Sequence, residues 1–172
     1  MHVVRGEVSA TGDALDLRYV LEGDLTGLAL APLAASRRVD GLWRHTCFEA
    51  FVAGTEANEY VELNFSPSTE WAIYRFSAYR AGRVAVETAR PPRIVVHNEG
   101  ACLSLQATVE CGLLGGLCNA PALRMALAAV VEQADGRLSY WALAHPPGQP
   151  DFHHAAGFAL EVRAAAADRL AR

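Results

Sequence analysis

The sequence contains no lysine, so all fifteen of its basic residues are arginines. These arginines are scattered along the chain, and the formal net charge at pH 7 is -4. Proteins that bind nucleic acids usually carry a stripe or cluster of basic side chains. The lack of such a cluster argues against a nucleic-acid partner.

Long apolar runs are also missing. No stretch approaches the roughly 18 uninterrupted apolar residues that a membrane-spanning helix requires. The first residues, MHVVRGEVSATGD, lack the basic start and apolar run that are typical of a secretory signal. We therefore expect a cytoplasmic protein that does not contact a membrane.

The cysteines lack the C-x-x-C spacing that is typical of zinc and redox sites. All four lie in apolar or strand-like surroundings, at Cys47, Cys102, Cys111 and Cys118. We expect reduced thiols, and the alternative is that one pair binds a metal or forms a bridge.

Familiar catalytic signatures are absent as well. The sequence has no G-x-S-x-G nucleophile motif, no phosphate-binding loop and no dinucleotide fingerprint. It also has no internal repeat and almost no amphipathic helix. These absences favour a binding protein over an enzyme.

What the sequence does contain is a succession of short strand-like segments separated by turn residues. With 172 residues, 52% of them hydrophobic, and no long linker, we expect a single domain over residues 1–172. The pattern predicts an all-β fold with little helix, a two-sheet antiparallel sandwich of the immunoglobulin-like or jelly-roll kind. A closed lipocalin-like barrel is the alternative.

Turn residues place the outer strands. We expect hairpins that join residues 3–10 to 14–21 and 93–97 to 102–109. Residues 123–132 fit a helix or a strand, and Asp135-Gly136 before residues 138–143 favours a hairpin. Residues 112–121 are predicted to form a loop, 158–162 a strand, and 164–172 a tail or final helical turn.

The clearest alternation of apolar and polar residues lies in the centre of the chain, which predicts strands over 46–53, 60–65 and 71–79. A four-residue loop, Ser66-Pro67-Ser68-Thr69, would join the last two. That loop length places Asn64 opposite Trp71, Glu62 opposite Ile73 and Tyr60 opposite Arg75.

One face of this predicted hairpin then carries the chemistry that a sugar requires. An indole can stack on the apolar face of a pyranose ring, and carboxylate, amide and guanidinium groups can bind its hydroxyls. Glu62, Asn64, Trp71 and Arg75 supply one of each. The structural alternative is an ordinary ion pair between Glu62 and Arg75 with Trp71 at the edge of the core.

A second group of polar residues follows a proline-rich loop. His145, Asp151, His153 and His154 offer imidazole and carboxylate ligands that suit zinc or another first-row metal, which could activate water. A metal-dependent hydrolase is therefore an alternative function. Asp151 could instead cap a turn while one histidine bonds the backbone.

Several motifs in order resemble one family. Leu42-Trp43, TCFEAFV, YVELNFSPSTEWAIYRF, YWALAHPPGQPDFHH and GFALEV, between Trp43 and Val162, are similar to the bacterial DOMON-like proteins. These are relatives of family 9 carbohydrate-binding modules and of DOMON domains that bind haem or sugar. The resemblance implies a ligand-binding β-sandwich.

The resemblance also implies site residues. Glu49, Glu62, Asn64 and Trp71 match polar and aromatic strand positions of the module, and Trp141 would be a second aromatic. DOMON cytochromes hold haem with a methionine and a histidine. Because Met125, the only internal methionine, lies in an apolar run, we do not expect haem. We expect no other cofactor, and a metal ion at the histidine loop is the alternative.

We conclude from the sequence that the chain is a non-catalytic binder of a carbohydrate or a small sugar-like molecule. A sugar, a sugar phosphate and a nucleotide sugar all remain open as ligands. A protein–protein interaction module, or a homodimer that pairs through exposed strand edges or the hairpin face, is the alternative alongside the hydrolase.

Overall fold

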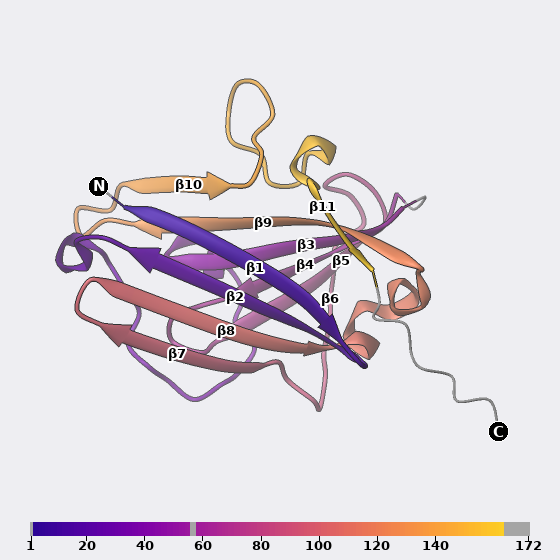
Figure 1. The fold of residues 1–172 in the computed structure, drawn as a ribbon, viewed down its shortest axis with the longest axis horizontal. Coiled ribbons are helices and arrows are strands. Elements are labelled where there is room, and N and C mark those ends of the chain that lie inside the picture. The colour runs from indigo at the N-terminus through magenta and orange to yellow at the C-terminus, as the bar shows by residue number, and fades with distance from the viewer. Residues whose placement is uncertain (1, 56–57, 164–172) are drawn as a thin grey trace.

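The computed structural model describes residues 2–55 and 58–163, which form two antiparallel sheets packed as layers (Figure 1). The smaller sheet has the strand order β1-β2-β8-β7. Its strands are β1 (Val3–Thr11), β2 (Ala14–Glu22), β8 (Cys102–Glu110) and β7 (Arg93–Glu99). Both of its hairpins lie where the turn residues predicted them.

The larger sheet has the order β10-β9-β3-β4-β5-β6, and β11 pairs with the other half of β9. Its strands are β10 (Leu138–Ala142), β9 (Ala122–Glu132), β3 (Cys47–Gly54), β4 (Tyr60–Phe65), β5 (Trp71–Phe76), β6 (Val84–Ala85) and β11 (Leu160–Arg163). The two sheets confirm the predicted antiparallel sandwich, and β9 resolves the ambiguity over residues 123–132 in favour of a strand.

Helix is confined to short 3₁₀ segments in the described chain. These are η1 (Leu25–Gly27), η2 (Leu42–Arg44), η3 (Cys111–Asn119) and η4 (Ala155–Gly157). η3 corrects the prediction of a loop over 112–121, with a break at Gly115, whose φ is 63°. None of the described helices is long and apolar enough to cross a membrane. The helical turn predicted for 164–172 lies outside the described residues.

Two of the cysteines can be compared directly with their prediction. Cys47 and Cys102 are free thiols, and Cys47 is fully buried on β3. The side chain of Cys118 lies outside the described part of the structure.

The main core lies between the sheets. Alternate residues of β2 and β8 point inward, so that Leu15, Leu17, Leu103 and Leu105 are fully or almost fully buried. They meet the inner face of the larger sheet, which includes Phe48 on β3. Each such side chain contributes about 1.5 to 3 kcal/mol relative to an exposed position.

A second apolar cluster covers the outer face of the larger sheet. Phe51, Tyr60 and Phe76 form part of it, and Phe152 and Phe158 pack on it from the segment after β10. Strands β3 and β4 are consequently buried on both faces along their whole length. Polar side chains that point outward from these strands are therefore withdrawn from solvent.

The register of β4 and β5 differs from the prediction by one residue. Phe65 lies opposite Trp71, Leu63 opposite Ile73, and Glu62 opposite Tyr74. The connection has five residues, 66–70, because the Ser66 amide bonds the Glu70 carbonyl oxygen. A slip of one residue moves every side chain of a strand to the other face of the sheet.

Candidate functional site

A cleft of about 390 Å³ opens on the outer face of the larger sheet. Its floor comes from β3, β4, β5 and β9, and its walls come from the segments around residues 43, 80 and 150. The lining residues are Trp43, Glu49, Glu62, Phe76, Arg80, Arg83, Val130, Tyr140, Pro150, Phe152 and His153. This volume lies in the range of small-molecule sites.

The strand pleat places two carboxylates on the floor. Glu49 and Phe51 are alternate residues of β3, and both point to the outer face. Glu62 lies opposite Phe51 on β4, and Asn64 lies opposite Glu49. Glu49 and Glu62 are therefore diagonal neighbours on adjacent strands, with side chains on the same face.

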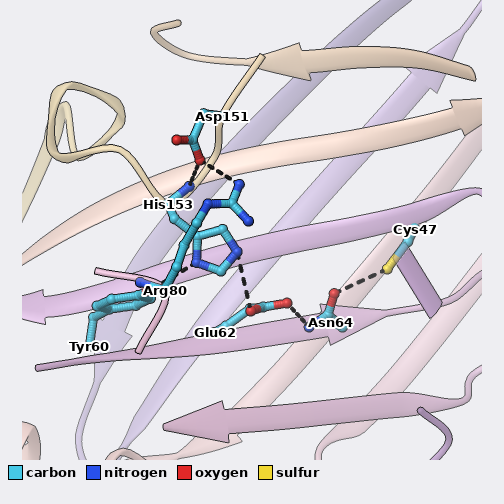
Figure 2. A network of polar contacts seen from close by, with 7 residues as sticks. All are labelled: Cys47, Tyr60, Glu62, Asn64, Arg80, Asp151 and His153. Carbon is cyan, nitrogen blue, oxygen red and sulfur yellow. Dashed lines mark hydrogen bonds and ion pairs between the residues drawn. The ribbon is translucent and has the colours of Figure 1, made fainter. Parts of the chain in front are cut away.

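Glu62 is anchored by its neighbours (Figure 2). Asn64 Nδ2 donates to Glu62 Oε1 at 2.8 Å, and the Cys47 thiol faces Asn64 Oδ1 at 3.7 Å. Glu62 Oε2 lies 3.8 Å from His153 Nε2. Burial raises the pKa of Glu62, while the bond from Asn64 acts in the opposite direction. Asn64 thus fixes Oε1 of Glu62, and Oε2 faces His153 in the cleft.

Glu49 has no such anchor. Its side chain is only 3% exposed, and Oε1 has no hydrogen-bond partner among the described residues. Burial, followed by the charge of Glu62, raises the pKa of Glu49 well above its ordinary value. A buried polar atom without a partner is costly, so a hydroxyl or amide group of a ligand in the cleft would relieve that cost.

His153 closes one side of the cleft. Its Nδ1 lies 2.7 Å from the Tyr60 hydroxyl, and its ring packs edge-on against Phe51 and Phe76. Burial lowers the pKa of His153 to about 4. The imidazole is therefore neutral near pH 7 and contributes polar ring nitrogens to the site without adding charge.

Asp151 holds the wall segment in place. It binds Arg80 Nη2 at 2.7 Å and accepts hydrogen bonds from the Tyr79 hydroxyl and the His153 amide. Burial alone would raise the pKa of Asp151, but the bonds from Tyr79 and Arg80 outweigh it and lower that pKa. Asp151 is thus an ionised link between the β5–β6 connection and the proline-rich loop.

The remaining loop histidines have other neighbours. His154 Nδ1 accepts the Ala156 amide at 3.1 Å and caps η4, and the His145 ring lies 6.1 Å from that of Phe152. Among residues 2–55 and 58–163, no three or more His, Cys, Asp or Glu side chains are grouped so that they could hold a metal ion. The four predicted ligands are therefore not gathered around one point in this structure.

Aromatic rings flank the cleft. Tyr140 is 46% exposed, and its ring meets that of Phe152 at a centroid distance of 6.1 Å. Trp43 packs edge-on against Tyr74, with centroids 5.7 Å apart, and Arg83 lies over both of these rings. The cleft thus combines a carboxylate floor with partly accessible aromatic surfaces.

Three of the predicted binding residues lie elsewhere. Trp71 is 3% exposed and packs in the main core opposite Phe65. Arg75 is on the same side of the sheet as Trp71 and donates to the Leu113 carbonyl oxygen. Trp141 packs against the main core, and its Nε1 bonds Ser139. Of the predicted sugar residues, Glu49 and Glu62 line the cleft, and Asn64 supports Glu62.

Eight cleft residues were not predicted as site residues: Trp43, Phe76, Arg80, Arg83, Val130, Tyr140, Pro150 and Phe152. Trp43 and Tyr140 belong to motifs that carried the family resemblance, but neither was chosen as a binding residue. Trp141, the neighbour of Tyr140, was chosen instead. Arg80 and Arg83 follow β5 on an irregular segment, where the alternation of apolar and polar residues cannot predict the side to which a side chain points. Only the tertiary structure brings these residues together.

No protein-family model matches the sequence, and no curated protein matches it at a significant level. Solved structures do match the fold. A candidate carbohydrate-binding protein from Bacteroides uniformis superposes with a TM-score of 0.66 and 15% identity, over 95% of this chain and 79% of that one. A family 9 carbohydrate-binding module from Caldicellulosiruptor kristjanssonii, solved with glucose, gives 0.58 and 9% identity, over 95% and 77%. At these identities the similarity establishes the fold alone.

Proposed function

We propose that the outer-face cleft binds a small carbohydrate without chemical conversion. The observation that carries the proposal is Oε1 of Glu49, which is buried on the cleft floor beside Glu62 and has no hydrogen-bond partner in the described part of the chain. A hydroxyl-rich ligand would supply the donor that this atom lacks.

The shape and chemistry of the lining suit a sugar in particular. A pyranose ring has apolar C–H faces, which pack on aromatic rings, and hydroxyls that both donate and accept. Trp43 and Tyr140 supply rings, Glu49 and Glu62 accept from hydroxyls, and Arg80 offers donors. Charge-assisted hydrogen bonds of this kind are stronger than neutral ones.

The structural neighbours support the choice of ligand class. One was solved with glucose, so glucose and its oligomers are the natural first ligands to test. Membership of the DOMON-like proteins, a cytoplasmic location and the absence of cofactors remain predictions from the sequence. The four-residue metal site and the hydrolase activity have no supporting observation among the described residues.

The test is calorimetric titration of the purified protein with glucose, galactose, mannose, xylose and cellobiose. We expect saturable binding by at least one sugar, accompanied by a rise in melting temperature, because a ligand that binds only the folded state stabilises it. Glu62→Gln and Trp43→Ala should each weaken binding at least about tenfold, or roughly 1.4 kcal/mol.

The matched control is Leu33→Ala, which removes an exposed apolar side chain outside the cleft. This variant should bind with wild-type affinity. The proposal is overturned if no sugar in the panel binds, or if the cleft variants bind as well as the wild type does. Recovery of the sugar after overnight incubation, measured by chromatography, checks that it is not converted.

A further inference from the structure

A second cavity, of about 360 Å³, shares Trp43 and Arg83 with the cleft. This cavity lies beside η2, the residues just before η2, and β6. Its lining residues are Arg38, Asp40, Gly41, Trp43, Arg44, Tyr74, Arg83 and Ala85. A ligand that extends out of the cleft past Trp43 would therefore enter a space rich in guanidinium groups.

The positive charge of one of the three arginines, Arg38, is balanced by carboxylates. Arg38 Nη2 lies 2.6 Å from Asp40 Oδ1, and Arg38 Nε lies 3.4 Å from Glu87 Oε1. Arg44 and Arg83, by contrast, have no ion pair with any described residue within 4.0 Å. The cavity consequently holds two positive charges that no carboxylate of the described chain contacts directly.

Two aromatic rings hold the Arg83 side chain in place. Its guanidinium carbon lies 5.1 Å from the ring centroid of Tyr74 and 5.7 Å from that of Trp43. Stacking on aromatic faces orients a guanidinium and leaves its N–H edge available for a planar anion. Carboxylate and phosphate groups fit that edge with two parallel hydrogen bonds.

From these observations we infer that the second cavity is a subsite for an anionic substituent, a carboxylate or a phosphate, on the sugar held in the cleft. Arg44 and Arg83 bind the anion. This inference rests on the proposed function and narrows its ligand class from carbohydrates in general to acidic ones.

The two ends of the combined site give the ligand a direction. Glu49 and Glu62 give the cleft floor hydrogen-bonding groups and, when ionised, negative charge that repels an anion, so the neutral hydroxyls lie there. Arg44 and Arg83 attract the anion to the other end. A ligand bound in the reverse orientation would place like charges together, which costs affinity.

The experiment compares three ligands that share one scaffold: cellobiose, cellobiouronic acid with its terminal carboxylate, and cellobiose 6′-phosphate. Titration at low salt should show that at least one acidic ligand binds about tenfold tighter than cellobiose. The ligand with the larger advantage identifies whether carboxylate or phosphate is preferred. The advantage should shrink in 0.5 M sodium chloride, because salt screens exposed charges.

Two variants localise the effect. Arg44 lines only the second cavity, so Arg44→Gln should reduce the ratio of acidic to neutral affinity at least about threefold while Arg83 retains the rest. Arg90→Gln, which removes an exposed arginine elsewhere, should leave the ratio unchanged. An acidic ligand with no advantage, or an advantage that Arg44→Gln does not reduce, overturns the subsite and leaves the proposed function standing. If cellobiose, the other neutral sugars and both acidic ligands all fail to bind, the proposed function fails as well.

Discussion

The Tyr60 hydroxyl and His153 Nδ1 lie 2.7 Å apart on the outer face of the larger sheet. This contact ties the proline-rich loop to β4, the strand that also carries Glu62. Burial lowers the pKa of His153, and the charge of Arg80 lowers it further, while Asp151 opposes both. The loop therefore docks with a neutral imidazole, and protonation of that imidazole opposes docking.

Acid should destabilise the protein through His153. The folded-state pKa of about 4 lies below the ordinary value of 6.5, so between these two pH values the unfolded chain binds a proton that the folded chain does not. The free energy of unfolding falls as pH falls through this window. We expect wild type to lose on the order of 1 to 2 kcal/mol more than His153→Gln between pH 7 and pH 4.5.

Thermal or urea unfolding of both proteins across that range measures this difference. Glu49 and Glu62 have raised pKa values, which act in the opposite direction, but both remain in the variant and cancel in the comparison. Equal loss of stability in the two proteins would show that His153 is not protonated on unfolding in this range.

Glu49→Gln should stabilise the protein while it weakens sugar binding. The pKa of Glu49 is raised well above 4.5, so at higher pH the folded chain resists ionisation that the unfolded chain accepts freely. An amide removes that cost. We expect a gain of about 1 kcal/mol at pH 8 and a smaller gain at pH 5, with at least about tenfold weaker binding.

Urea unfolding at pH 8 and pH 5 tests the predicted gain in stability. Titration with the best-bound sugar tests the predicted loss of affinity. Glu99→Gln, at an exposed position on β7, is the matched control and should change neither quantity. A variant that is less stable than wild type at pH 8 would mean that the Glu49 carboxylate has a stabilising partner in the folded protein.

The sandwich fold could be predicted from the sequence because apolar and polar residues alternate strongly in strands that bury only one face. Buried residues of β2 and β8 alternate strictly with partly buried or exposed ones, and turns such as Gly12-Asp13 separate the strands. On β3 and β4 every residue is buried, so burial does not follow the alternation, and the second apolar cluster could not be predicted from it.

The site was predicted only in part because it depends on register and on loops. Glu49, which the family resemblance singled out, and Glu62, which lay on the predicted polar face, both line the cleft, and their role in binding stays a prediction. The loop after β4 is one residue longer than predicted, with Thr69 at a φ of 74°. That single residue moves Trp71 and Arg75 to the opposite face, and their sequence pattern is equally consistent with either register.

We therefore expect Trp71 to contribute to the stability of the fold and not to ligand binding. Its side chain is in the main core, so Trp71→Ala should lower the free energy of unfolding by about 3 to 5 kcal/mol. Trp71→Phe should cost much less, because it keeps a ring and removes an Nε1 donor that has no partner within residues 2–55 and 58–163. Urea unfolding compares the two variants. Wild-type stability of Trp71→Ala would place this indole outside the core.

Tyr140 and Trp141 provide the sharpest test of which face binds the ligand, because they are adjacent on β10 and point to opposite sides of the sheet. Tyr140→Ala removes an exposed ring at the cleft and should weaken sugar binding about tenfold with little change in stability. Trp141→Ala removes a ring packed on the core and should lower the free energy of unfolding by about 2 kcal/mol with unchanged affinity. Titration and urea unfolding on both variants give four values. If Trp141→Ala loses affinity while Tyr140→Ala does not, the ligand binds on the other face and the cleft is not the site.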